Sequence, residues 1–514
     1  MDLPIMNASN NDDFENPITY KPKHAIIQDL IDFINRRTPI INTPKTKAEK
    51  LPIKTDRLFL FNKAIKRAIQ DGEQEMGAEN ITNLDTYLEF ADKLIEWTPT
   101  VTSTGDEVLR KILVFYWPFN QQELSDLQTP IAPTFTDTDL RWLSYWLVAY
   151  ARRLGEYMSQ PESVGNIWSF YTSEKYGQGP GDADRGSEKY DRGHRYEQWK
   201  VPDGGWKSFN DWFSREWADI NKSRPLDGEG DNKVIVQGAD SVFNGHWDIN
   251  NGIVHINPDD TKSAEVSIKI KGIEWPIKDL VRTSTEDTRY DNGSFTHAFL
   301  GPTDYHRQHA PVEGYVVEAK NIQEQVYLQV AQSITKEGKT TISPERDIIV
   351  SPQELQRRFD NTAELEKKTN SDSQENLLAL YRENNHLEPN QSEQPSANGP
   401  KPDVGITAPD HAGYQWCQTR GLVVIDTDLD SKGNKKPEGG HGRVAVLPIG
   451  MAQVSSVVLT VKKGDYLQKG QNISYFQFGG SDIVTVFEKR PTYKAGLEAG
   501  KTKLHIREHV ADWK

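Results

Sequence analysis

The sequence has almost no cysteine. Cys417 stands alone among 514 residues, so an intrachain disulfide is excluded. A chain without disulfides suits a reducing compartment and does not require an oxidising one. Positive charge is also in deficit, because the formal net charge is −14. This balance argues against nucleic acid or an anionic membrane surface as the main partner.

Long apolar runs and a targeting segment are missing as well. Residues 1–16 are polar and acidic, without the basic and apolar regions of a secretory signal or the arginines of a transit peptide. The most apolar helical run, 145–151, lies between two arginines and is far too short to span a bilayer. We therefore predict a cytoplasmic protein without stable membrane insertion.

Apolar residues are nevertheless sufficient for a large core, because 36% of the chain is hydrophobic and 10% is aromatic. The predicted fold class is α+β, with an N-terminal helical domain followed by a β-rich domain that ends in a sandwich-like β section. The predicted divisions are a polar arm (1–55), the helical domain (56–170), a linker (171–204) and the β-rich domain (205–514).

Helical periodicity supports the first of these two domains. The third predicted helix carries Trp142, Trp146 and Tyr150 at helical spacing, and such an aromatic stripe is more typical of a core than of a ligand site. The three predicted helices are 56–70, 83–97 and one that starts after 136–139 and runs past residue 154.

Short β-patterned runs punctuated by Gly and Pro follow from about residue 204. Residues 361–402 are rich in Asn, Ser, Gln and Glu, which predicts an exposed, largely flexible insertion with one short helix near 377–381. Two Lys-Gly turns, at 463–464 and 469–470, resemble the β-sandwich of lipoyl and biotinyl carriers in architecture only. The clearer predicted strands are 234–243, 266–270, 295–300, 314–318, 325–330 and 422–425.

The stretch Phe478-Gly479-Gly480-Ser481-Asp482 lies between two strand-like runs, 473–478 and 483–487. Paired glycines indicate unusual dihedral angles or a close backbone approach. We place Ser481 at a sharp turn, where its hydroxyl faces a neighbouring carbonyl. Taken alone, the stretch favours an ordinary glycine hairpin, and other residues are needed to give it a chemical role.

Three polar residues upstream supply candidates for that role. His306 and His309 are three residues apart, but no cysteine pair or carboxylate cluster accompanies them, so we predict no metal site. Asp240 ends a β-patterned run. An Asp, a His and a Ser can form a nucleophilic relay. A serine hydrolase is therefore one interpretation, although Ser481 lacks the Gly-x-Ser-x-Gly motif of the nucleophile elbow.

Four stretches resemble, in order, the motifs of the phosphatidylserine decarboxylase family of pyruvoyl-dependent enzymes, which includes soluble amino-acid decarboxylases such as tryptophan decarboxylase. The resemblance covers roughly residues 205–514, and the helical region resembles the extension of the soluble, non-mitochondrial branch. Asp482 stands where the best-known members have a small hydroxyl residue, and Ser241 where glycine is usual. The four stretches are Phe213-Ser214-Arg215 with Arg224-Pro225, Gly238-Ala239-Asp240, Thr303 to Pro311, and Phe476 to Ser481.

This resemblance implies an enzyme that processes itself. The Ser481 hydroxyl attacks the carbonyl of Gly480, the chain breaks between these residues, and residue 481 becomes a covalent pyruvoyl cofactor. The resemblance implies His309 as the base for cleavage and Asp240 as the residue that orients it. His306 is our candidate for protonating the substrate carbanion, because imidazole titrates near neutral pH. The fragment 481–514 is expected to stay with 1–480.

The pyruvoyl ketone is then expected to form a Schiff base with a substrate amine and to draw electrons from the breaking Cα–carboxylate bond, as pyridoxal phosphate does. We predict a free L-amino acid such as tryptophan as the substrate. Phosphatidylserine, which would give phosphatidylethanolamine, is the alternative. A non-catalytic member of the same fold, acting as an interaction protein, is a second alternative. A homo-oligomer is compatible with the sequence.

Overall fold

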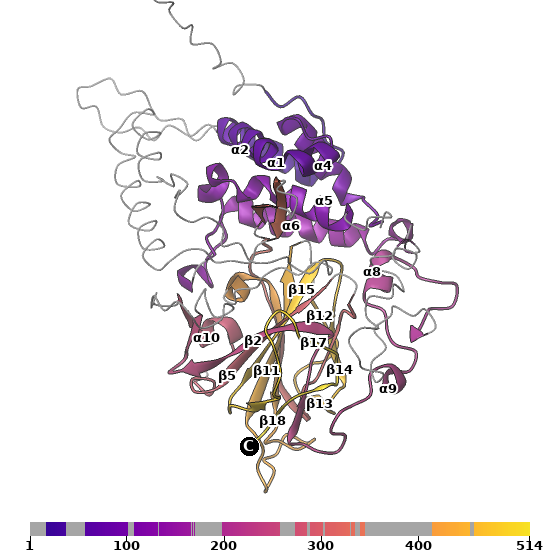
Figure 1. Cartoon of the computed structure of the whole chain (residues 1–514), viewed down its shortest axis with the longest axis vertical. Helices are drawn as coiled ribbons and strands as arrows, with labels where there is room; N and C mark the ends of the chain where they lie inside the picture. The colour runs from indigo at the N-terminus through magenta and orange to yellow at the C-terminus, as the bar shows by residue number, and fades with distance from the viewer. Residues whose placement is uncertain are drawn as a thin grey trace, which may run out of the picture.

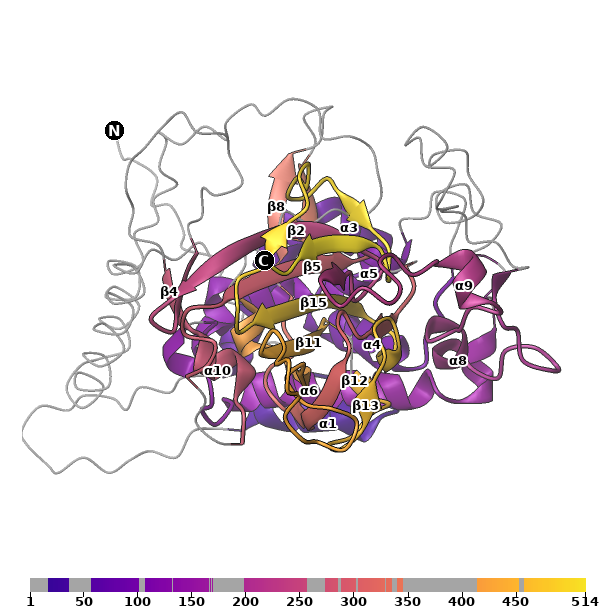
Figure 2. The same ribbon diagram turned by 90° about the horizontal axis from the view of Figure 1, so that it is seen from below.

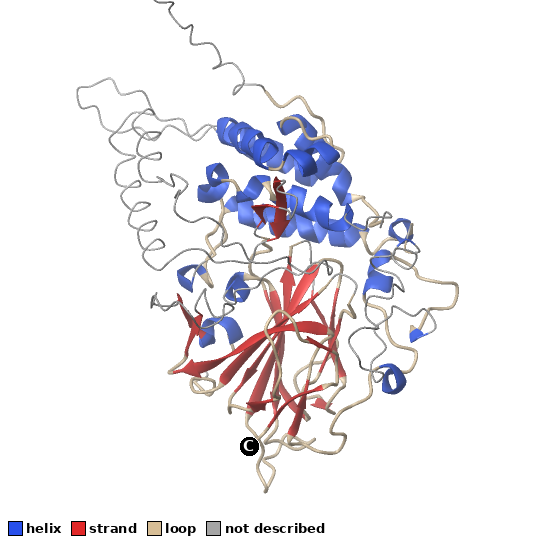
Figure 3. Ribbon diagram, viewed as in Figure 1, coloured by secondary structure: helices blue, strands red, loops and turns tan. Residues whose placement is uncertain are grey.

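A computed structural model describes residues 17–36, 57–100, 107–131, 133–165, 167, 169, 198–256, 273–284, 288–301, 304–328, 330–334, 340–344, 414–452 and 457–514. Helices gather at one end of the molecule and strands at the other (Figures 1 and 3). The α+β prediction is confirmed. The predicted insertion 361–402 and the predicted strand 266–270 lie outside the described residues.

Six α-helices form the N-terminal layer of the described chain. Helix α4 begins at a capping box, in which the side chains of Asn83 and Thr86 each bond the other residue's backbone N–H. Three of the six match the predicted helices. The six are α1 (Ala25–Asn35), α2 (Arg57–Asp71), α3 (Glu73–Ala78), α4 (Leu84–Ile95), α5 (Glu107–Tyr116) and α6 (Trp142–Tyr157).

Helix α1 lies within the segment that we predicted to be a polar arm. Its apolar side chains are buried, and the ring of Phe33 stacks on that of Trp142 in α6 at a centroid distance of 3.9 Å. The carboxylate of Asp92 in α4 accepts hydrogen bonds from the backbone N–H groups of Lys23 and His24 just before the helix. The prediction missed α1 because its apolar stripe is short and the flanking residues are polar.

The aromatic stripe of α6 is part of the core, as predicted. Trp146 and Tyr150 are buried, and Tyr150 stacks on Phe115 of α5 at 4.4 Å. Their polar atoms are paired, because the Trp146 indole donates to the carbonyl of Ile26 and the Tyr150 hydroxyl donates to that of Ala91. Buried aromatic residues with satisfied polar atoms hold helices together rather than form a ligand site.

The β-rich part is built on a ten-stranded antiparallel sheet in the order β13-β7-β10-β11-β15-β5-β2-β3-β4, with β17 paired to β2. Figure 2 shows β15 between β11 and β5. The strands are β2 (Ser241–Asn250), β3 (Ile253–Ile256), β4 (Ile273–Pro276), β5 (Ser294–Leu300), β7 (Gly314–Ile322), β10 (Arg420–Asp426), β11 (Arg443–Met451), β13 (Tyr466–Leu467), β15 (Gly480–Phe487) and β17 (Lys503–Leu504).

Smaller sheets complete the sandwich-like part. One joins β12 (Val457–Leu459), β14 (Asn472–Phe476) and β6 (Arg307–His309), and another joins β1 (Val234–Val236), β18 (His509–Asp512) and β16 (Thr492–Tyr493). Strand β8 (Val330–Ile334) pairs with β9 (Thr340–Pro344), and β9 contacts the helices α2, α3 and α5. The predicted strand 234–243 is divided between β1 and the start of β2, because residues 237–240 between them are not part of a strand.

Two hydrophobic clusters cover the two sides of β15. One contains Ile483 and Phe213 and continues into the helical layer through residues such as Leu154 of α6. The other contains Val484 with Phe295 and Trp416. Successive side chains of a strand point to opposite faces, so neighbouring residues of β15 contribute to different cores. Among the described residues, no helix is long and apolar enough to cross a membrane.

Candidate active site

Ser481 is the second residue of the central strand β15. It pairs with Gly450 of β11 on one side and with Leu300 of β5 on the other. The prediction of a sharp turn at Ser481 is wrong, because the irregular segment ends at Gly479, two residues before Ser481. Gly479, with φ of 144°, has the dihedral angle that L-residues rarely adopt. The turn therefore precedes the Gly480–Ser481 bond, and the sheet holds the bond itself.

The imidazole of His306 contacts the Ser481 hydroxyl, with Nδ1 and Oγ 3.3 Å apart. Both side chains are fully buried. Phe213, in the short helix α8 (Phe209–Phe213), stacks on the imidazole at 3.9 Å. The carbonyl of His306 accepts a hydrogen bond from Phe476 N–H, which ties the backbone to β14. The ring is thus held from two directions against the hydroxyl.

His309 lies in a different polar environment. Its Nδ1 is 2.7 Å from the carbonyl oxygen of Gly470, and its Nε2 is 3.2 Å from the Tyr305 hydroxyl. A carbonyl oxygen can only accept, so Nδ1 carries the proton and Nε2 accepts from the tyrosine. Burial lowers the pKa of His309 to about 4, which makes the ring neutral at pH 7.

This lowered pKa predicts an acid sensitivity of the fold. Between its ordinary value of 6.5 and about 4, the unfolded chain binds a proton at His309 that the folded chain does not. Stability must therefore fall as pH is lowered through this window, by up to about 1.4 kcal/mol per pH unit from this group. Urea unfolding at several pH values measures the slope. His309→Asn, which keeps an N–H donor but does not titrate, should have a shallower slope, and equal slopes would contradict the prediction.

Asp240 is buried in the break between β1 and β2. The guanidinium of Arg224 donates to both carboxylate oxygens, with its Nη2 2.6 Å from Oδ2, and the backbone N–H of Ile506 donates to Oδ1 at 2.9 Å. The imidazole Nδ1 of His505 is 3.5 Å from Oδ2. Burial alone would raise the pKa of Asp240, but the charges of Arg224 and His505 outweigh it and hold the pKa well below its ordinary value.

The structure brings His306 together with Ser481 and brings His505 to Asp240. It places His309 beside Tyr305 and Gly470. In the described part of the chain, the side chains of Asp240, His309 and Ser481 are therefore not linked to one another by direct hydrogen bonds, as the expected relay would require. The backbone N–H of His309 does donate to the carbonyl of Gly238, which couples its strand to the segment that carries Asp240.

Asn210 of α8 links the helical layer to the turn before Ser481. Its side-chain oxygen accepts from the N–H of Phe478 at 2.8 Å, and its amide nitrogen donates to the carbonyl of Gly155 in α6. Asn210 is buried. The helical domain therefore helps to position the Gly480–Ser481 bond.

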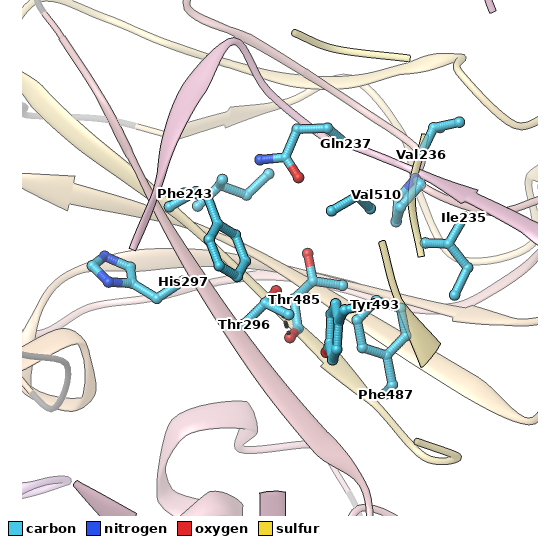
Figure 4. Close-up of a pocket in the computed structure, with 13 residues that line it drawn as sticks. Ile235, Val236, Gln237, Phe243, Thr296, His297, Thr485, Phe487, Tyr493 and Val510 are labelled. Atoms are coloured by element: carbon cyan, nitrogen blue, oxygen red, sulfur yellow. Dashed lines mark hydrogen bonds between the residues drawn. The ribbon is translucent and has the colours of Figure 1, made fainter. Parts of the chain in front are cut away.

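A small cavity lies between the β1–β18 pair and the face of the sheet that carries Ile483, Thr485 and Phe487 of β15 (Figure 4). Its volume of about 10 Å³ has room for about one water molecule and not for a substrate. Gln237, Thr296 and Thr485 supply polar groups to it, and the ring of His297 points away from these side chains (Figure 4).

Comparison with known proteins identifies the family. Residues 209–360 and 369–511, more than half of the chain, match the family model of phosphatidylserine decarboxylase. The chain belongs to the phosphatidylserine decarboxylase family. The four motifs and all the site residues described above lie within the matched segments.

Individual relatives in this family are distant. A phosphatidylserine decarboxylase proenzyme 3 from Schizosaccharomyces pombe is 24% identical over 59% of this chain and 21% of its own length. An L-tryptophan decarboxylase from Psilocybe cyanescens is 25% identical over 60% of this chain and 53% of its own length. A phosphatidylserine decarboxylase proenzyme from Fusobacterium nucleatum is 22% identical over 72% of this chain and 82% of its own length. The chain thus spans about a fifth of the length of the first of these relatives and about half of the length of the second.

The site residues fit a pyruvoyl precursor of the kind that the phosphatidylserine decarboxylase family uses. A buried serine hydroxyl meets an imidazole nitrogen, and the residue before it has no Cβ to hinder approach to its carbonyl. The described residues contain no group of three or more His, Cys, Asp or Glu side chains arranged to hold a metal ion.

Several contacts of this site were missed by sequence reasoning. Arg224 and Phe213 lie within recognised motifs, so the motifs marked them without revealing what they touch. His505 and Asn210 had no comparable signal, because their roles depend on contacts with residues more than 200 positions away. Spacing along the chain carries no information on such pairs.

Proposed function

We propose that this protein is a self-processing, pyruvoyl-dependent decarboxylase. The observation that carries the proposal is the buried contact between His306 Nδ1 and Ser481 Oγ, directly after Gly480 in a paired strand. A neutral imidazole at this distance can take the hydroxyl proton and make the oxygen nucleophilic. The family membership supports the same chemistry.

In the proposed cleavage, Oγ of Ser481 adds to the carbonyl carbon of Gly480 and the peptide C–N bond breaks, which leaves an ester. Loss of the Cα proton of residue 481 expels the carboxylate of Gly480, and water then replaces the nitrogen, which leaves as ammonia. His306 can hold the protons that move at residue 481. No external reagent except water is needed, so the chain can process itself.

The small fragment, residues 481–514, remains built into the fold. It supplies the central strand β15 together with β16, β17 and β18, which pair with strands of the large fragment or with each other. Cleavage leaves these strand pairings in place, apart from Gly480, which stays with the large fragment, and the backbone donor of residue 481, which is lost with its nitrogen. The two fragments are therefore expected to separate only when the protein is denatured.

When formed, the pyruvoyl group supplies a ketone that accepts the electrons of the breaking Cα–carboxylate bond of an amine substrate. The chain's own residues provide the surroundings. Phe213 stacks on the His306 imidazole and packs edge-on against Phe478, and His306 is placed to return a proton at residue 481. Arg224 and Asp240 form a buried ion pair that joins the segment after α8 to the start of β2.

Mass spectrometry of the purified, denatured protein tests the proposal. We expect a small fragment of 34 residues that starts at former Ser481 and a large fragment that ends at Gly480. The same preparation should elute as one species under native conditions. A single species of 58.4 kDa from an active preparation would overturn the pyruvoyl mechanism.

For the substrate, we propose a free L-amino acid such as tryptophan. The similarity to an L-tryptophan decarboxylase and the net charge of −14, which disfavours an anionic lipid surface, support it. The two relatives named phosphatidylserine decarboxylase support phosphatidylserine as the second candidate. A cytoplasmic location stays a prediction.

Product analysis separates the two candidates. The protein is incubated with L-tryptophan in detergent-free buffer and, separately, with phosphatidylserine in mixed micelles. Tryptamine with carbon dioxide supports the first, and phosphatidylethanolamine alone would contradict it while leaving the mechanism intact. An intact chain without either product would favour a non-catalytic interaction protein.

A further inference from the structure

Asp482, the residue after the reactive serine, points to the other side of the sheet. Ser481 shares its face of β15 with Ile483, and Asp482 shares the opposite face with Val484. The opposite face is covered by an apolar cluster that includes Phe295 and Trp416. A carboxylate in such surroundings is costly unless it is paired.

Tyr414 and His297 both contact this carboxylate. The Tyr414 hydroxyl donates a hydrogen bond to Oδ2 of Asp482, and Nε2 of His297 lies 3.5 Å from the same oxygen. His297 and Asp482 are fully buried and Tyr414 is 5% exposed. We call His297, Tyr414 and Asp482 the rear cluster.

The rear cluster joins three elements behind the cleavage site. His297 comes from β5, Asp482 from β15, and Tyr414 from the short 3-10 helix Tyr414–Cys417 that precedes β10. Neither ring nitrogen of His297 makes a hydrogen bond to another residue in the described part of the chain. The imidazole is therefore available to Asp482, and the cluster ties β15 to its surroundings from the side away from His306.

We propose that the rear cluster consists of positioning residues that hold residue 481 against His306 during cleavage and after residue 481 has become a chain end. This inference rests on the proposed function. Cleavage removes the covalent link to Gly480 and the backbone nitrogen of residue 481, so residue 481 loses both its chain neighbour and its donor to the ladder. Chain ends are poorly ordered unless they are tied down.

Residue 482 is the first complete residue of the new fragment, so its side chain is the nearest anchor. Because that side chain lies on the rear face, it can hold the strand without occupying the face on which residue 481 meets His306. A buried carboxylate with a tyrosine donor gives a directional, charge-assisted hydrogen bond, which fixes orientation better than apolar packing does.

The test compares Tyr414→Phe, Asp482→Asn and the double variant with the wild-type chain. Cleavage is followed during cell-free synthesis of the full chain by the appearance of the 34-residue fragment. Turnover is measured with L-tryptophan and with phosphatidylserine in mixed micelles. We expect cleavage and kcat to fall about ten- to hundredfold, the range for lost hydrogen bonds to a charged group, with KM little changed. The double variant should be no slower than the slower single variant.

Tyr290→Phe is the matched control, because Tyr290 is a buried tyrosine of the same hydrophobic cluster. It should cleave and turn over as the wild type does. Wild-type rates in Tyr414→Phe and Asp482→Asn would overturn the inference. The inference would also be overturned if cleavage and kcat fell in all three single variants in proportion to the drop in their melting temperatures, since that pattern indicates a structural role. If the wild-type chain does not cleave, the proposed function itself has failed.

Discussion

Replacing Ser481 with alanine is expected to leave the chain in one piece of 58.4 kDa and to abolish decarboxylation. Without the hydroxyl that contacts His306, nothing can add to the carbonyl of Gly480, and no ketone can form at residue 481. Mass spectrometry of the denatured protein measures whether the chain is cleaved, and product formation measures decarboxylation. Added pyridoxal phosphate should not restore decarboxylation.

Ser294→Ala is the control for this variant. Ser294 is a buried serine of the neighbouring strand β5, and its hydroxyl bonds that of Tyr493. Its loss should leave cleavage intact. In the wild type, a hydride reductant added with substrate should attach mass to the small fragment alone. Label on the large fragment, or full activity in Ser481→Ala, would exclude residue 481 as the electron acceptor.

His306→Ala and His309→Ala are expected to differ, because only His306 contacts the reactive hydroxyl among the described residues. Removing a base that touches the nucleophile costs about 10²–10⁴-fold, so His306→Ala should nearly stop cleavage. His309→Ala should slow cleavage indirectly, because it removes the bonds to Gly470 and Tyr305 that hold β6 in place. The time course of fragment formation measures both.

His309→Asn serves as the control for the positioning role, since an amide can still donate to the Gly470 carbonyl. It should cleave faster than His309→Ala. The opposite result would be normal cleavage in His306→Ala and an uncleaved chain in His309→Ala. It would show that His309 is the base for cleavage, as the family resemblance implied. His306→Ala would then be expected to lose turnover only.

Much of the architecture could be predicted from sequence because its signals are local. The helices α2, α4 and α6 have one-sided apolar stripes, and the strands around Phe295 and Leu422 are β-patterned. Helix α1 was missed because its apolar residues lie in a polar stretch and find their partners in the distant helices α2, α4 and α6. The turn was misplaced because pairing of Gly480 with Met451 extends β15 by three residues beyond its apolar run.

The candidate site shows the same division. Ser481, His306, His309 and Asp240 were named from motifs, since residue types and order survive in the linear sequence. The partners of these residues were not predicted. Arg224 and His505 reach Asp240 from opposite parts of the chain, and their charges set its pKa. A pKa depends on distance and burial, which spacing along a chain does not encode.

The sequence by itself determined the family, the α+β class and the serine at which cleavage is proposed, because each rests on residue identity and short-range pattern. The tertiary structure alone decided which histidine meets that serine and which side chains stand behind it. β15 pairs with β5 and β11, and this register puts Ser481 on one face and Asp482 on the other. Because side chains alternate along a strand, Ser481 contacts His306 on one face and Asp482 contacts Tyr414 on the other. The residues of the first pair are 175 positions apart in the chain, and those of the second pair are 68 apart.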